Sequence, residues 1–448
     1  MKRSTIATAG IAAAAALVLV GCSSGNPGGD PSEPSDTGTA TSTETEGGDA
    51  EPVTISVSGW SLDTTPEFQV LADGFTANNP HVTVELKEYD AAEYNTLLTA
   101  DLAAGAGPDI ITQKEVKFLT TFQEGGQLLD VSDVPLPDGI SGTSSYEVDG
   151  VAYAVPYRQD SWVLYYNKDL FAAAGVDEPD GSWTWDDYAD AAAAVTTGLS
   201  NAGSAAKGAY LHRWQSTTQG FANAQAPGAD ILSGDFGHLA PFYERVLAMQ
   251  DAGSQIDFNT SNANQLTYQG EFGKQNAAML PMGTWFVATL ISQQAAGEAD
   301  DFAWGIAPIP QLDASTTGTD GTPVTFGDPT GFGINARVGD DKVQVAKDFL
   351  AYAASEEAAS ALAGIGITPA LVSDAVAEIF FAVDGAPTDE LSKFAYSTNE
   401  VKPENPTSNQ TATVQGILGD LHTAVLSGSE SIESAIAAAQ QRFDNEVN

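Results

Sequence analysis

Two loops of the chain carry residues that could bind a polar small molecule. Trp60 follows an alternating apolar stretch at 53–58, and Gln113 and Glu115 follow a second apolar stretch at 108–112. An aromatic ring can cover the apolar C–H face of a sugar, while amide and carboxylate groups hydrogen-bond to hydroxyl groups. Residues of these types at the ends of strands therefore indicate a site for a ligand rich in hydroxyl groups.

Two short matches to enzyme motifs lack the flanking secondary structure that those motifs require. The match to G-x-S-x-G at 21–25 overlaps the N-terminal apolar segment, so it lacks the strand-to-helix turn that a nucleophile requires. The glycine pair at 331–333 imitates a dinucleotide-binding turn, but the strand that should precede it is interrupted by Pro329. With one cysteine and four scattered histidines, the chain predicts no metal centre, and we expect no cofactor.

Strands and helices alternate in the part of the chain that must position these loops. The successive strand and helix segments are 53–58, 66–79, 82–86, 94–102 and 108–112. Such an alternation predicts a parallel sheet with right-handed crossovers, and ligands of these sheets lie beyond the carboxyl ends of the strands. Alanine-rich helices are predicted later in the chain, at 186–197, 342–362 and 432–443.

The charge balance excludes several classes of partner. The 448 residues include 17 Lys and Arg against 60 Asp and Glu, which gives a net charge of −43. A nucleic-acid-binding protein needs a basic surface to replace counterions, and electrostatic adsorption to anionic lipid needs a polybasic patch. We therefore expect no nucleic-acid partner. A strongly charged surface also repels copies of itself, so we expect a monomer.

The N-terminus predicts export and a lipid anchor. Two basic residues precede an apolar stretch at 6–20, which is typical of a signal peptide and short for a transmembrane helix. The following Leu-Val-Gly-Cys resembles the bacterial lipobox, which implies that Cys22 is acylated and becomes the first residue. We expect a signal peptide at 1–21 and a flexible acidic tether at 22–52, because that segment has no large aliphatic or aromatic residue. The expected location is the outer face of the cytoplasmic membrane.

Five regions after the tether resemble, in order, the extracellular solute-binding proteins of ABC importers, in particular the maltose-binding-like carbohydrate group. The regions are 75–84, 94–110, 149–187, 277–308 and 331–352. They include the motifs Gly-Pro-Asp-Ile at 107–110, Tyr-Tyr-Asn-Lys at 165–168 and Met-Gly-Thr-Trp at 282–285. Each motif alone is weak evidence, but five regions in the family's order are specific.

The resemblance implies an α/β fold with two lobes, each a mainly parallel sheet flanked by helices, joined by segments that cross a hinge. Lobe 1 would comprise 53–158 plus 331–368, and lobe 2 would comprise 159–330 plus 369–448. It further implies that the protein is not an enzyme. The protein would bind a mono- or oligosaccharide between the lobes and deliver it to a pair of permease subunits served by a cytoplasmic ATPase.

The resemblance also implies where the ligand is contacted. Asp160 occupies the position at which the family has a carboxylate that bonds sugar hydroxyls, and Trp285 the position of a tryptophan that stacks on the sugar. Phe332 lies between two glycines, at a position where family members have a larger aromatic or a small residue. The expected ligand-binding residues are Trp60, Asp63, Gln113, Glu115, Asp160, Arg213, Trp214, Trp285 and Phe332. For Trp60 and Trp214 a place in the core is an equally good interpretation, and Asp160 could instead bond across the hinge.

Two other functions fit the same residues. A secreted, lipid-anchored glycoside hydrolase would need two carboxyl groups at a suitable separation, one with a raised pKa. A glycan-retaining surface protein would share the anchor and the aromatic residues without needing the lobes to close. Within the importer class, an acidic sugar is a further alternative, because some of the few basic residues lie in or beside the predicted site: Lys114, Lys117, Arg158, Lys168 and Arg213.

Overall fold

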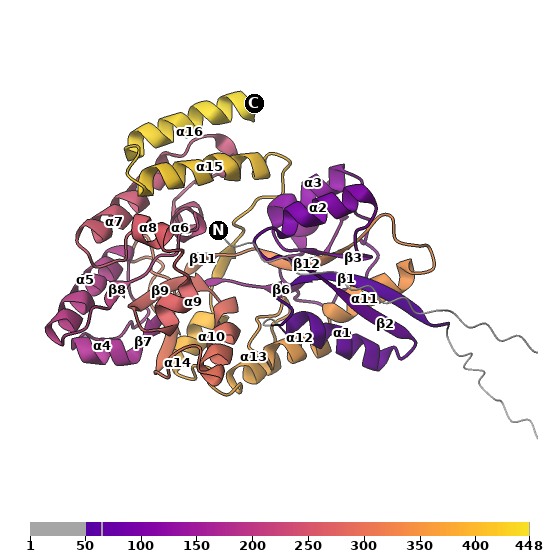
Figure 1. Cartoon of the computed structure of the whole chain (residues 1–448), viewed down its shortest axis with the longest axis horizontal. Helices are drawn as coiled ribbons and strands as arrows, with labels where there is room; N and C mark the ends of the chain where they lie inside the picture. Colours follow the sequence, from indigo (N-terminus) through magenta and orange to yellow (C-terminus); the bar gives the residue numbers. More distant parts are fainter. Residues whose placement is uncertain (1–50, 64–65, 448) are drawn as a thin grey trace, which may run out of the picture. The chain divides into compact units, whose positions relative to one another are not determined.

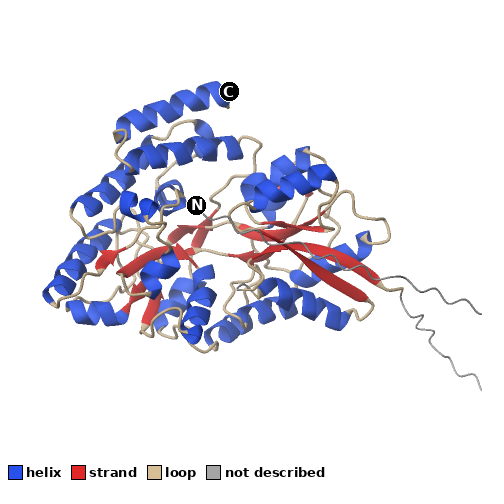
Figure 2. Ribbon diagram, in the orientation of Figure 1, coloured by secondary structure: helices blue, strands red, loops and turns tan. Residues whose placement is uncertain are grey.

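Two β-sheets organise the chain (Figures 1 and 2). The computed structural model describes residues 51–63 and 66–447. The predicted signal peptide, all but the last two residues of the predicted tether, and Cys22 lie outside the described residues. Among the described helices, none is long and apolar enough to cross a membrane.

The first sheet has five strands and forms the centre of lobe 1. In spatial order its strands are β2 (Val82–Tyr89), β1 (Val53–Trp60), β3 (Ile110–Gln113), β12 (Pro329–Ile334) and β6 (Val155–Gln159). Its helices are α1 (Glu67–Asn78), α2 (Tyr94–Ala104), α3 (Leu119–Glu124), α11 (Val343–Ala353) and α12 (Glu356–Ala363). Helices α1, α11 and α12 share one apolar cluster with the sheet, and α2 and α3 share another, so both faces are covered.

The second sheet has four strands and forms the centre of lobe 2. In spatial order its strands are β10 (Trp304–Ala307), β7 (Trp162–Asn167), β9 (Ala277–Gly283) and β8 (Lys207–Ala209). The helices whose buried residues join its core are α4 (Lys168–Ala174), α5 (Trp185–Asn201), α6 (Ser216–Gln225), α7 (Ala240–Asp251), α8 (Phe258–Ala263), α9 (Tyr268–Gly273), α10 (Trp285–Ala296), α13 (Asp374–Phe381), α14 (Glu390–Ser397), α15 (Thr411–Leu426) and α16 (Ile432–Glu446).

Short elements complete the fold. Strand β11 (Val324–Phe326) pairs in parallel with β13 (Glu400–Lys402), and β4 (Glu147–Val148) forms a hairpin with β5 (Val151–Ala152). Four single 3₁₀ turns are described, at Val116–Phe118, Thr143–Tyr146, Ile231–Ser233 and Gly237–Leu239.

The two-lobed α/β architecture is confirmed, but both sheets are mixed rather than mainly parallel. Strand β12 runs antiparallel to β3 and β6, and β7 runs antiparallel to β9 and β10. The crossing segments explain this difference. Strand β6 leaves lobe 1 beside the place where β12 enters it, so the two neighbours must run in opposite directions.

The predicted helices are found with one exception. Residues 342–362 form two helices instead of one, because α11 ends at Ala353 and α12 begins anew after Ser355. The Ser355 hydroxyl accepts a hydrogen bond from the Ala358 amide at 3.2 Å, which is the arrangement of a helix N-cap. The helix from Tyr94 ends at Gly105, whose left-handed backbone (φ 72°) suits glycine.

Candidate functional site

Three short segments carry the chain between the lobes. Residues 160–161 join β6 to β7, residues 327–328 join β11 to β12, and residues 364–373 join α12 to α13. The first and third lie side by side, because the Gln159 amide donates to the Thr368 carbonyl oxygen at 3.3 Å. A backbone hydrogen bond therefore joins the first and third crossing segments.

A buried chain of charged groups runs through this crossing. The guanidinium of Arg158 bonds Glu67 of α1 through Nη1 and Asp160 through Nε, each at 2.5 Å. Tyr157 donates its hydroxyl to the other oxygen of Glu67 at 3.0 Å. Burial alone would lower the pKa of Arg158, but the two carboxylates more than offset burial and raise it.

Asp160 continues this chain into lobe 2. Its Oδ1 accepts a hydrogen bond at 2.9 Å from the hydroxyl of Thr284, the residue that precedes α10. Thr284 and Ser161 also bond through their backbones, at 2.9 Å. Both carboxylate oxygens of Asp160 thus have protein partners, and the residue fixes the start of the helix that carries Trp285.

Aromatic side chains gather next to this helix start. The Trp285 ring packs edge-on against Trp162, with centroids 5.4 Å apart, and lies 6.5 Å from the ring of Trp214. Tyr268 packs against Trp214 at 5.6 Å. Trp214 is 41% exposed, so much of its indole surface is open to a ligand. We call Trp214, Trp285 and Tyr268 the lobe 2 aromatic cluster.

The cluster lies close to the charged crossing. Burial raises the pKa of the Tyr268 hydroxyl to about 12, and the charges of Arg158 and Asp160 act on it with opposite signs. Flat apolar surface, a phenol and fixed charges therefore lie side by side, which is the combination that sugar recognition requires.

Two buried histidines support the loop that carries Trp214. His212 packs edge-on against the Trp214 ring at 4.5 Å, and its Nδ1 lies 3.1 Å from the Tyr210 hydroxyl. His422 of α15 places Nε2 3.2 Å from the carbonyl oxygen of Arg213 and Nδ1 3.0 Å from the Tyr243 hydroxyl. A carbonyl oxygen only accepts, so the Nε2 of His422 carries the proton.

The pH dependence of stability is expected to show the role of His422. Burial lowers its pKa to about 4, whereas an unfolded histidine titrates near 6.5. As the pH falls, the histidine is protonated in the unfolded chain before it is protonated in the folded protein. The free energy of unfolding is therefore highest above pH 6.5, and it decreases by about 3 kcal/mol as the pH falls toward 4. His422→Gln does not titrate, so denaturant unfolding should show wild type losing its advantage over this variant across that pH range. A constant difference between the two proteins would contradict this.

A second aromatic group lies at the end of β1 in lobe 1. The Trp60 ring packs edge-on against Phe68 at 5.0 Å and Tyr94 at 5.3 Å. Lys114 places its ammonium 5.2 Å from the centre of the Trp60 ring and donates to the Ala91 carbonyl oxygen. Burial lowers the pKa of Lys114. Trp60 is half-buried, so one part of its ring belongs to the core and the rest is accessible.

Glu115 lies beside this group and has partners on two sides. It accepts a hydrogen bond from the Asn95 amide and pairs with Lys117 at 2.9 Å. Lys117 and Glu115 also act electrostatically on Glu404, which hydrogen-bonds to Ser216, two residues beyond Trp214.

Glu404 and Asp328 are two carboxyl groups with raised pKa values. Burial is the main cause, and it raises the pKa of Asp328 to about 6 and that of Glu404 to about 7. Asp328 accepts hydrogen bonds from the Glu404 amide at 2.9 Å, the Asn405 amide at 3.2 Å and the Asn405 side chain at 2.5 Å. These bonds hold the chain after β13 against the second crossing segment.

Two of the expected ligand-binding residues are buried. Phe332 is fully buried in the core of lobe 1, where its ring stacks on Tyr157 at 4.3 Å. Gln113 is 1% exposed, and both polar atoms of its side chain are sealed off without a hydrogen-bond partner. Both residues lie on inner strands of a sheet that is covered on both faces, and Gln113 is the last residue of β3, so their role in ligand binding stays a prediction.

The other expected residues are distributed around the crossing. Asp63 is exposed in the loop after β1. Arg213 is half-buried on lobe 2 and bonds Gln265 at 3.1 Å. Trp214 and Trp285 come together in lobe 2, Trp60 and Glu115 lie on lobe 1, and Asp160 lies between them.

Sequence reasoning missed Tyr268, Thr284 and Glu404. Tyr268 begins α9 and meets the cluster only through the packing of α9 on β9, so no spacing in the sequence indicates it. Thr284 lies beside Trp285 in the motif Met-Gly-Thr-Trp. Its polar side chain in an apolar segment could have indicated that it makes a hydrogen bond.

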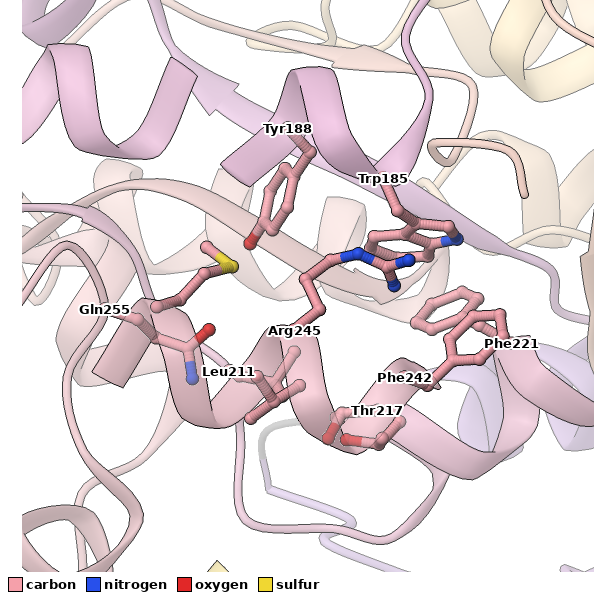
Figure 3. A pocket seen from close by; sticks show the side chains of 11 residues that line it. Trp185, Tyr188, Leu211, Thr217, Phe221, Phe242, Arg245 and Gln255 are labelled. Atoms are coloured by element: carbon pink, nitrogen blue, oxygen red, sulfur yellow. The ribbon is translucent and has the colours of Figure 1, made fainter. Parts of the chain in front are cut away.

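Lobe 2 also contains a small cavity, which is too small to be the ligand site (Figure 3). It measures about 20 Å³ and is lined by Trp185, Tyr188, Arg245 and Gln255 among others. That volume has room for about one water molecule and is far too small for a sugar. Among the described residues, no cluster of histidine, cysteine and carboxylate groups could hold a metal ion.

Known proteins resemble the chain over different lengths. A binding protein of Brucella abortus (strain 2308) is 26% identical over 283 residues, which cover 61% of this chain and 66% of that protein, just under two thirds. The sn-glycerol-3-phosphate-binding periplasmic protein UgpB of Escherichia coli (strain K12) is 32% identical over 169 residues, which cover 34% of this chain and 36% of that protein.

Solved structures resemble the chain over most of its length. A sugar transporter from Rhizobium etli, in an open conformation, has a TM-score of 0.75 and 28% identity, covering 87% of this chain and 99% of that one. The Listeria monocytogenes ABC substrate-binding protein in complex with cycloalternan has a TM-score of 0.73 and 18% identity, covering 89% and 99%, and this likeness is one of fold.

The sequence profile of the bacterial extracellular solute-binding protein family matches residues 61–360, which is more than half of the chain. The two sheets, the crossing segments and the order of the motifs agree with that match. The chain belongs to the family of bacterial extracellular solute-binding proteins.

Proposed function

We propose that the protein is the sugar-binding component of an ABC importer and captures a mono- or oligosaccharide between its lobes. The observation that carries this proposal is the lobe 2 aromatic cluster. Trp214 exposes 41% of its surface beside Trp285, next to fixed charges at the point where the chain crosses between lobes. A partly exposed indole offers a flat apolar face that the C–H face of a sugar ring can cover.

Binding works by closure of the lobes. A sugar that stacks on the lobe 2 aromatic cluster and bonds polar groups of lobe 1, such as Glu115, gains contacts only when the lobes approach each other. The ligand therefore shifts the population toward the closed form by its differential affinity. Asp160 acts as a positioning residue in this scheme, since it fixes the start of α10 rather than presenting a free carboxylate.

The charges around the site favour a neutral sugar over an acidic one. Lys114 bonds a backbone carbonyl oxygen, Lys117 pairs with Glu115, and Arg213 bonds Gln265. A uronate or a phosphate would have to take these cations from their partners. Unpaired Glu115 would then repel the anion, so the resemblance to UgpB does not by itself extend to its phosphorylated ligand.

A glycoside hydrolase is the second candidate, because Asp328 and Glu404 have the raised pKa values that a catalytic acid needs. Asp328 is nevertheless engaged by three hydrogen bonds that hold the chain at Asn405. A carboxyl group in that position acts as a structural cap, and we propose no catalytic role for the pair.

The remaining parts of the proposal concern the cell. Cys22 would carry the lipid that anchors the protein to the outer face of the membrane, and 22–52 would tether the body. The closed form would dock on a permease pair, and a cytoplasmic ATPase would drive import. The anchor is supported by the sequence around Cys22, and the docking by membership of the family.

Isothermal titration calorimetry with a panel of neutral, acidic and phosphorylated saccharides tests the proposal. We expect one or a few neutral sugars to bind, with chromatography of the samples finding them unchanged. Release of a hydrolysed product would favour the hydrolase instead. Failure of every sugar to bind would overturn the proposed function.

A further inference from the structure

A second groove lies on lobe 2, at the far end of β7 from the crossing segments. It has a volume of about 530 Å³, which is within the range of small-molecule sites. Its apolar wall includes Leu391 and Phe394 of α14, and its polar lining includes Tyr166, Lys168, Glu178 and Asp389. None of the nine expected ligand-binding residues lines this groove, although Lys168, considered above for an acidic sugar, does.

Tyr166 is the unusual member of the lining. The residue is 2% exposed, and its ring lies across the neighbouring strand, where a Cβ on Gly305 would fall 2.6 Å from the hydroxyl oxygen. The hydroxyl makes no hydrogen bond to any residue in the described part of the chain. It is also not among the polar atoms sealed off from solvent, in contrast to the hydroxyl of Tyr188. A buried tyrosine usually pairs its hydroxyl, so this one is available to a ligand in the groove.

The charges of the groove select the kind of ligand. Lys168 is already paired with Asp389 at 2.9 Å, and Asp389 also accepts two hydrogen bonds from Ser392. Glu178 is exposed and, within the described residues, has no hydrogen bond or ion pair. Glu178 and Tyr166 line the same groove, so the carboxylate and the hydroxyl face one cavity. The lining as a whole has four carboxylates against one ammonium group.

We propose that this groove is a second ligand site, independent of the sugar site, and that it binds an aliphatic amine. The ammonium group would donate to the Tyr166 oxygen and to the Glu178 carboxylate, and the carbon chain would lie along Leu391 and Phe394. The hydroxyl oxygen and the carboxylate can accept two of the three N–H donors of an ammonium group, water can accept the third, and the apolar wall suits the carbon chain. A diamine would place its second charge near the other carboxylates of the rim.

The test compares cadaverine (1,5-diaminopentane) with 1,5-pentanediol by isothermal titration calorimetry in 150 mM salt. Salt at that concentration screens general attraction to an acidic surface. We expect cadaverine to bind and pentanediol not to bind. Tyr166→Phe should weaken cadaverine binding about tenfold, since it removes a hydrogen bond to a charged group without changing the net charge. Glu178→Gln should weaken it to a similar degree.

Matched control variants distinguish binding in this groove from general attraction of an amine to an acidic protein. Tyr188→Phe removes another buried tyrosine hydroxyl of lobe 2, and Glu298→Gln removes an exposed carboxylate elsewhere on the lobe; both should bind cadaverine as wild type does. Equal affinities of Tyr166→Phe and wild type would overturn the proposal, as would equal losses in the two glutamate variants. Tight binding of pentanediol would overturn the assignment to amines. None of these outcomes depends on whether a sugar binds at the Trp214 site.

Discussion

Replacing Arg158 with alanine is expected to lower the free energy of unfolding by about 3–5 kcal/mol. Among the described residues, the guanidinium is the one cation paired with Glu67 and Asp160, both of which are buried. Its removal leaves two carboxylates that have lost their solvent and their counter-charge and that repel each other. Denaturant unfolding followed by tryptophan fluorescence measures the loss.

A surface pair provides the matched control for this variant. Lys347 pairs with Asp133 at 2.6 Å, but the aspartate side chain is 69% exposed. Lys347→Ala should therefore cost less than about 1 kcal/mol. A triple variant, Glu67→Gln with Arg158→Met and Asp160→Asn, removes all the buried charges and should recover much of the loss. If Arg158→Ala is no more damaging than Lys347→Ala, the charged chain does not stabilise the crossing.

Replacing Trp214 with alanine is expected to weaken sugar binding by at least tenfold, with little effect on stability. The ring contributes contact area at the centre of the proposed site, where large aromatic residues dominate binding energy. Because Trp214 is the most exposed of the clustered rings, its removal leaves the lobe 2 core largely intact. Titration calorimetry with a sugar identified from the panel measures the affinity.

Trp183 is the matched control, since it is a half-buried tryptophan of the same lobe that packs on Phe171 away from the cluster. Trp183→Ala should change the stability and leave the affinity for sugar as in wild type. If both variants bind sugar as wild type does, the lobe 2 aromatic cluster is not the binding surface.

The fold could be predicted largely from the sequence, because the relevant information is local. Alternating apolar residues define β1, and the proline after Asn79 ends the region of α1. The direction of β12 could not be predicted in this way. It depends on where the chain returns from lobe 2, which is a property of the whole fold and not of the residues 329–334.

The residues predicted for the site lie in different surroundings in the structure, and the differences have a common physical cause. Trp214 and Trp285 are far apart in the chain, yet family motifs placed both in the site and the structure brings them together. Gln113 and Phe332 were expected at the site because they end a strand or stand between glycines. Both side chains are buried, which depends on helices that are distant in sequence, and their role at the site stays a prediction.

The excess of acidic residues also affects how the few basic residues of the chain are used. The few cations near the proposed site have partners within the protein, as Lys117 does with Glu115 and Arg158 does with Glu67 and Asp160. They serve to fix carboxylates in place rather than to attract an anionic solute. A neutral sugar is the ligand that such a site accommodates without breaking ion pairs.

The most direct test of the central claim is small-angle X-ray scattering of the protein with and without a sugar that binds. Capture between the lobes predicts a smaller radius of gyration when the sugar is present at saturating concentration. Trp214→Ala should show no such change at the same sugar concentration and should match wild type in its absence. A sugar that saturates the wild-type protein and leaves its radius of gyration unchanged would contradict binding by closure of the lobes.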